Sequence, residues 1–168
     1  KSEEFENLFN EYIKDFITPD IIYSSPLRQM NELEVVEEFV KYPKYFKVFS
    51  SCNRNFRISP STSPRTRRFR APLRTNPQRI WCGKCAKCLF VFVFLAAFLP
   101  KKEVLGIFGQ NLFEDKSLLT LFEELLGIKN FKPFECVGTP EEMKLALSKV
   151  AQNKEFNKDF LIKYFLKK

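Results

Sequence analysis

Three cysteines in the segment RIWCGKCAKCLF, residues 79–90, constrain this chain more than any other feature of its sequence. Cys82, Cys85 and Cys88 are separated by two residues each, in a chain of 168 residues with five cysteines and no histidine. A CxxC turn aims two sulfurs at one cation, and the cation favours their thiolate form. A tetrahedral site needs a fourth ligand, which here must be a cysteine, a carboxylate or water. Cys52, at the end of a predicted strand, is the natural candidate.

Three interpretations of these cysteines stay open. The first is a structural zinc site formed by Cys52, Cys82, Cys85 and Cys88, which leaves no open coordination position. The second is an iron–sulfur cluster, although the ferredoxin pattern would place a further cysteine near Phe92. The third is a group of buried cysteines without a metal. The spacing favours zinc, which would fasten the predicted strand end to the helix that carries the last cysteine.

Composition indicates about one globular domain, because 45% of the residues are hydrophobic and 20 of them are phenylalanines. The longest apolar run, Cys88 to Leu99, has 12 residues, which favours a buried core helix over membrane contact. No signal-peptide pattern opens the sequence, and clustered cysteines suit a reducing compartment. We therefore expect a cytoplasmic protein without a membrane partner.

The net charge of +8 comes from one segment. Eight arginines and no acid or lysine lie between Arg54 and Arg79, whereas the rest of the chain balances 20 basic against 20 acidic residues. This segment favours a solvated loop, and the alternative is the arm of a small nucleic-acid-binding zinc module. Because the remainder is neutral, we expect nucleic acid not to be the partner.

Periodicity predicts a helix-rich α/β fold. The apolar residues recur at helical spacing and are expected to form the core. The predicted helices cover residues 3–16, 32–41, 87–99, 101–108, 117–126, a segment that starts at the TPEE sequence of residues 139–142, and the tail after residue 156. The segments IIYSS (21–25) and KVFSSC (47–52) predict short strands. We expect a strand and helix portion at 1–56, an Arg/Pro-rich flexible loop or insertion at 57–80 and a zinc-linked helical region at 81–168.

Four segments carry a family resemblance. They are SSPLRQMNELEVVEEF (24–39), FSSCNRNF (49–56), WCGKCAKCLFVFVFLAAFLPKKEVLGIFG (81–109) and KPFECVGTPEE (132–142). Together they resemble the C-terminal part of the UDP-N-acetylmuramoyl-L-alanyl-L-glutamate epimerase family. The cysteine pattern is also similar, more distantly, to the zinc site of the queuosine-pathway deazaguanine nitrile synthase. Both resemblances imply the C-terminal part of an ATP-pyrophosphatase-like (adenine nucleotide hydrolase-like) fold.

The first resemblance implies an ATP-dependent isomerase of peptidoglycan synthesis, and therefore of cell-wall biogenesis and cell shape. Such an enzyme adenylates the terminal carboxylate of UDP-MurNAc-L-Ala-L-Glu and inverts the α-carbon to give D-Glu. Adenylation removes the carboxylate charge, which makes the α-proton more acidic. The implied cofactors are ATP, magnesium and structural zinc. The second resemblance implies an alternative, another carboxylate-activating enzyme with a substrate such as a deazaguanine.

Four further side chains are site candidates under this resemblance. Glu135 and Cys136 are the first candidates for the proton transfer, and the alternative is that they form a packing turn. Arg28 and Arg54 are candidates for binding a substrate carboxylate or phosphate, and the alternative is a surface salt bridge for each.

The sequence also departs from the full pattern of such an enzyme. It has five glycines and no Ser/Gly-rich loop that would cradle phosphate on backbone N–H groups. We therefore expect the N-terminal ATP-binding half to be a missing partner, and this chain alone to be inactive.

Overall fold

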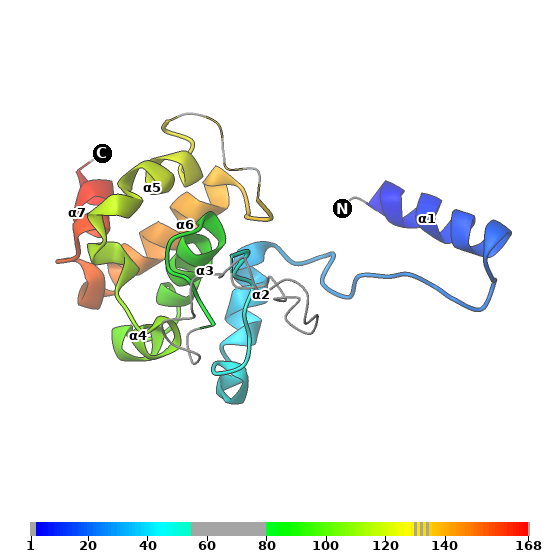
Figure 1. The fold of residues 1–168 in the computed structure, drawn as a ribbon, viewed down its shortest axis with the longest axis horizontal. Helices are drawn as coiled ribbons and strands as arrows, with labels where there is room; N and C mark the ends of the chain where they lie inside the picture. The colour runs from blue at the N-terminus through cyan, green and yellow to red at the C-terminus, as the bar shows by residue number, and fades with distance from the viewer. Residues whose placement is uncertain (1–2, 55–79, 130, 132, 134, 168) are drawn as a thin grey trace, which may run out of the picture.

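The structure, a computed structural model, describes residues 3–54, 80–129, 131, 133 and 135–167. Figure 1 shows a body of packed helices, from which α1 and the extended segment after it project. The helices are α1 (Glu3–Phe16), α2 (Glu32–Phe39), α3 (Ala86–Ala96), α4 (Lys101–Phe108), α5 (Leu119–Leu125), α6 (Pro140–Gln152) and α7 (Phe160–Leu166). Short 3-10 helices are η1 (Pro43–Tyr45), η2 (Leu112–Glu114), η3 (Lys116–Leu118) and η4 (Lys154–Phe156). The predicted helical segments are therefore confirmed, with ends shifted by a few residues.

Helix α3 is the centre of the body. Its sequence AKCLFVFVFLA is apolar on almost every side, and all its residues except Lys87 and Val91 are buried. A helix of this kind must be surrounded by other elements, and α3 packs against α2, α4, α5 and α6 (Figure 1). The prediction of a buried core helix here is confirmed. Within the described ranges, no helix has the length and apolarity that a bilayer crossing requires.

Local capping signals define where several helices begin and end. Asn31 and Glu34 form a reciprocal capping box at the start of α2, and Thr139 and Glu142 form another at the start of α6. Gly127, just beyond α5, has a φ of +67°, a left-handed conformation that glycine adopts without steric cost. These signals are short in sequence, so the pattern alone locates these ends correctly.

A buried carboxylate joins the last helix to the body. Asp159, only 2% exposed, precedes α7 and accepts hydrogen bonds from Lys101 Nζ at 2.6 and 2.7 Å. It also accepts one from Asn111 Nδ2 at 2.8 Å. A buried charge is tolerated when it is paired and hydrogen-bonded, and these contacts link the beginnings of α4, η2 and α7.

The two predicted strands are wrong. Residues 21–25 and 47–52 have no regular secondary structure, and the described residues contain no strand with which they could pair. Side chains satisfy part of their backbone instead: Asn10 bonds both the N–H and the C=O of Tyr23, at 2.7 and 2.9 Å. The described part of the chain is thus helical and not α/β, and the ATP-pyrophosphatase-like fold stays a prediction.

Helix α1 forms as predicted, but most of its apolar stripe does not join the core. Leu8, Tyr12 and Phe16 are 59%, 53% and 76% exposed, and Ile13 is the buried residue of this helix. The prediction that this stripe is core is wrong for these residues, because the body of described helices does not cover it (Figure 1). The arginine-rich residues 57–79 lie outside the described residues.

Candidate metal centre

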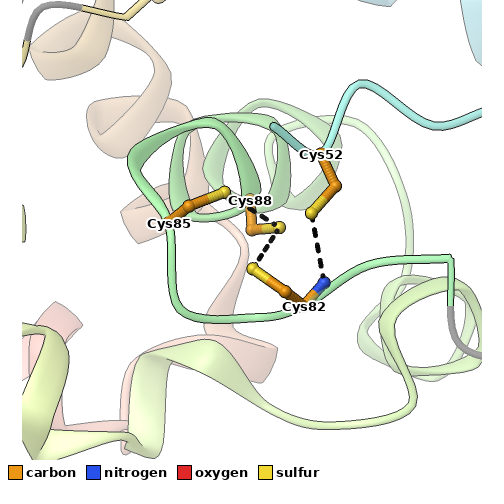
Figure 2. Close-up of side chains that lie close together, drawn as sticks. All are labelled: Cys52, Cys82, Cys85 and Cys88. Carbon is orange, nitrogen blue, oxygen red and sulfur yellow. Dashed lines mark hydrogen bonds between the residues drawn. The ribbon is translucent and has the colours of Figure 1, made fainter. Parts of the chain in front are cut away.

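The structure brings the four predicted cysteines together. Figure 2 shows Cys52 from the segment after η1, Cys82 from the loop before α3, and Cys85 and Cys88 from the start of α3. Their four Sγ atoms lie within 4.8 Å of one another, and no disulfide joins them. Cys136, the fifth cysteine, is exposed and outside this group. The group therefore gathers three segments of the chain around one point.

The sulfur geometry fits a single tetrahedral cation. Cys88 Sγ lies 3.7 Å from Cys82 Sγ and 3.5 Å from Cys85 Sγ. With metal–sulfur bonds of about 2.3 Å, a regular tetrahedron places its sulfurs about 3.8 Å apart. In an iron–sulfur cluster the cysteines bind different irons, so their sulfurs would lie further apart. Four soft thiol donors at these separations could hold one metal ion, and this donor set suits zinc.

Backbone N–H groups surround the sulfurs. Cys82 N–H donates to Cys52 Sγ at 3.4 Å, and Lys84 N–H donates to Cys82 Sγ at 3.4 Å. The turn between the first two cysteines of the trio passes through Gly83, whose φ of +67° is unfavourable for other residues. Cys52 and Cys88 are fully buried. The backbone donors favour thiolates, and the burial makes this a closed site.

The thiols hold their protons unequally. The hydrogen bond shared with Cys88 lowers the pKa of Cys85 to about 4. The same contact, together with burial, raises the pKa of Cys88, and burial raises the pKa of Cys82. The group therefore favours negative charge on Cys85, while Cys82 and Cys88 keep their protons more readily, and a bound cation would favour the thiolate form of its cysteine ligands.

Glu135 forms the next layer around the cysteines. Its Oε2 accepts the backbone N–H of Lys87 at 3.1 Å and Nδ2 of Asn53 at 3.0 Å. Lys87 lies in the first turn of α3, where the N-cap residue Cys85 provides no side-chain cap, so the carboxylate takes that role. Asn53 directly follows Cys52. Glu135 thus links the segment of Cys52 and the first turn of α3 to the loop before α6.

The sequence pattern does not single out Asn53 or Lys87, because nothing local marks either residue as a partner of Glu135. Lys87 Nζ also donates to the Cys136 carbonyl, which further fixes the loop at residues 135–137. The Glu135 carboxylate therefore already accepts two hydrogen bonds, whereas the adjacent Cys136 is exposed to solvent. Their predicted part in proton transfer stays a prediction.

The two predicted arginines occupy different environments. Arg28 forms an ion pair with Glu6 of α1, which agrees with the salt-bridge alternative and places Arg28 with the projecting helix. Arg54 is exposed and lies two residues after Cys52. Arg54 is thus close to Cys52 in sequence, whereas Arg28 pairs with α1. Substrate binding by either arginine stays a prediction.

A cavity of about 690 Å³ opens between η1, Ile80 and α4. Its lining includes Phe46 and Ile107, with Lys47 and Glu103 as the charged members. Close to it in sequence, Trp81 packs against Phe49 and Phe108 with ring centroids 5.2 and 4.8 Å apart. These aromatic contacts hold the segment before Cys82 on the body.

A family model and three known proteins that are similar to this chain all point to the same family. The family model described as the MurL C-terminal domain matches residues 48–168. The UDP-N-acetyl-alpha-D-muramoyl-L-alanyl-L-glutamate epimerase of Xanthomonas oryzae pv. oryzae is 37% identical over 99% of this chain and 34% of its own length. The protein of the same name from a Micromonospora species is 35% identical over 93% of this chain and 31% of its own length.

A third protein with that name, from Salinispora tropica, is 34% identical over 88% of the chain and 29% of its own length. The chain thus spans about a third of the length of the curated relatives it matches. No solved structure matches it significantly. Because the family model covers well over half of the residues, the predicted resemblance is confirmed, and this chain belongs to the MurL epimerase family as its C-terminal part.

Proposed function

We propose that this chain is the zinc-bearing C-terminal part of an ATP-dependent epimerase that converts the terminal L-Glu of UDP-MurNAc-L-Ala-L-Glu to D-Glu. One observation carries the proposal: 99% of the chain aligns, at 37% identity, with a protein named as that epimerase. No comparable match supports the deazaguanine alternative. The nucleic-acid alternative depends on the arginine-rich segment, which lies outside the described residues.

The proposed metal is zinc, held by Cys52, Cys82, Cys85 and Cys88. The separations of 3.5 and 3.7 Å between sulfurs support one ion and not a cluster. Four thiolates complete the coordination of zinc, so it would supply stability and no reaction chemistry. It would pin the segment that carries Cys52 and Asn53 to the first turn of α3, where Glu135 also binds.

The proposed reaction consumes one ATP, which is converted in two steps to pyrophosphate and AMP. The terminal glutamate carboxylate attacks the α-phosphate of ATP and forms an acyl-adenylate, with pyrophosphate as the leaving group. A base removes the α-proton, a proton is added to the opposite face, and water then releases AMP and the D-Glu product. ATP and its magnesium ion would bind to the remaining part of the enzyme, and we expect no turnover from the 168-residue chain alone.

Within this chain, we assign different roles to two neighbouring residues. Glu135 already accepts two N–H groups, so it positions the loop beside the metal centre. Cys136 exposes its side chain next to that anchored carboxylate, and its thiol is the proposed proton-transfer group. Arg54, exposed near Cys52, is the proposed contact for an anionic substrate group, and Arg28 is a more distant candidate.

The test uses the full-length enzyme with ATP, magnesium and UDP-MurNAc-L-Ala-L-Glu in deuterated water. We expect D-Glu product that carries deuterium at the α-carbon, together with release of AMP and pyrophosphate. The absence of AMP release with this substrate would refute the proposal.

Cys136→Ser separates the two steps. It should reduce epimerisation at least about 100-fold, the usual contribution of a positioned acid or base, while substrate-dependent exchange of pyrophosphate into ATP continues. Unchanged epimerisation in this variant would reject Cys136 while leaving the overall reaction in place.

A further inference from the structure

The apolar stripe of α1 is a surface that the described body leaves exposed. Leu8, Tyr12 and Phe16 recur at helical spacing and are each more than half exposed, as is Ile22 in the segment that follows. Figure 1 shows α1 projecting from the helical body. Scattered exposed apolar residues are ordinary, but a continuous stripe along a 14-residue helix is typical of an interaction surface.

Local contacts give this surface a defined shape. Asn10 bonds the backbone of Tyr23, and the rings of Phe9 and Tyr23 pack edge to face with centroids 5.2 Å apart. The Glu6–Arg28 ion pair joins α1 to the end of the same returning segment. The helix and the segment after it therefore form one unit with the apolar stripe on its outside.

The family boundary indicates what covers the stripe. The model of the C-terminal domain starts at residue 48, but the Xanthomonas relative aligns with 167 residues of the chain. Residues 3–47 thus match the relatives and lie outside their C-terminal domain. Helix α2 within this range packs on the body through buried Leu33, whereas α1 does not. About two thirds of the relatives' length remains unmatched by this chain.

We propose that the α1 stripe docks onto the upstream portion of the family enzyme, the part that corresponds to those unmatched two thirds. This inference rests on family membership and not on the proposed reaction. A membrane surface is a poorer occupant, because α1 carries five acidic residues and one lysine, whereas interfacial helices are rich in Lys and Arg. A second copy of the chain is the remaining alternative.

The test co-expresses this chain with its cognate upstream portion, the sequence from the same genome that corresponds to the unmatched part of the relatives. Only the upstream portion carries an affinity tag, and the amount of this chain that is retained is measured. Leu8→Asp places a charge on the apolar stripe. Asn7→Asp is the matched control, because it places the same charge on the neighbouring exposed position of the polar face. Metal content and circular dichroism check that both variants fold.

We expect the wild-type chain and Asn7→Asp to be retained, and Leu8→Asp to bind at least about tenfold more weakly, because it places a charge where the complex would bury a leucine. Failure to retain the wild-type chain would overturn the proposal, and so would equal retention of both variants. Self-association of the chain alone that Leu8→Asp abolishes, without retention by the upstream portion, would assign the stripe to a second copy instead. None of these results depends on epimerase activity.

Discussion

Replacing Cys85 with serine should abolish the proposed zinc binding and destabilise the body of helices. The metal would join Cys52 to Cys82, which are 30 positions apart, and thereby close a loop. The chain-entropy relation assigns a cross-link of this length about 4 kcal/mol of stability. For a chain of this size, the loss of that amount lowers the melting temperature by about 10 °C. Cys85→Ser is expected to show this full loss, because three thiolates no longer complete the tetrahedron.

The assay combines metal analysis with thermal unfolding. The wild-type chain should carry about one zinc ion and show no visible charge-transfer absorption. Cys136→Ser is the matched control, since it makes the same chemical change at an exposed thiol outside the group. Cys85→Ser with a full complement of zinc and an unchanged melting temperature would refute the reasoning. A visible iron absorption in the wild-type chain would refute zinc.

Further predictions concern the contacts around the site and the core. Glu135→Ala should lower the free energy of unfolding by about 2 kcal/mol, because α3 loses its cap, whereas Glu114→Ala at an exposed position should change it little in denaturant titrations. Lys101→Met leaves the buried Asp159 carboxylate without its cation and should cost about 3 kcal/mol in the same assay, and a neutral result would contradict the pairing. Gly83→Ala should cost at least about 1 kcal/mol, because alanine is strained at a φ of +67° and its Cβ would overlap the Gln110 side chain, and it should lower the melting temperature without abolishing metal binding.

The cysteine group shows which part of a site residue spacing can predict. The CxxCxxC pattern predicts that three thiols can face one ion, because the turn between them is short. The choice of Cys52 over Cys136 as the fourth depends on packing across 30 residues. The structure places Cys52 beside the trio, and its role as a metal ligand stays a prediction. The role of Glu135 differs: its partners Asn53 and Lys87 are 82 and 48 positions away, so only the folded chain reveals that it caps α3.

The strands show where a local pattern fails. Residues 21–25 and 47–52 have the composition of strands, but a strand is stable only when a neighbour satisfies its backbone. The described residues offer no such neighbour, and side chains such as Asn10 and Ser50 bond these segments instead.

The helices, their caps and the trio of cysteines follow from local sequence, because each depends on contacts between residues three or four positions apart. Which apolar faces are buried follows from the packing of distant segments. Helix α3, apolar on almost every side, is enclosed by four neighbouring helices, whereas the apolar stripe of α1 stays exposed although it recurs at regular helical spacing. Periodicity shows that a helix has an apolar face, but burial also requires a surface opposite that face. For α1, that surface is not within the described residues.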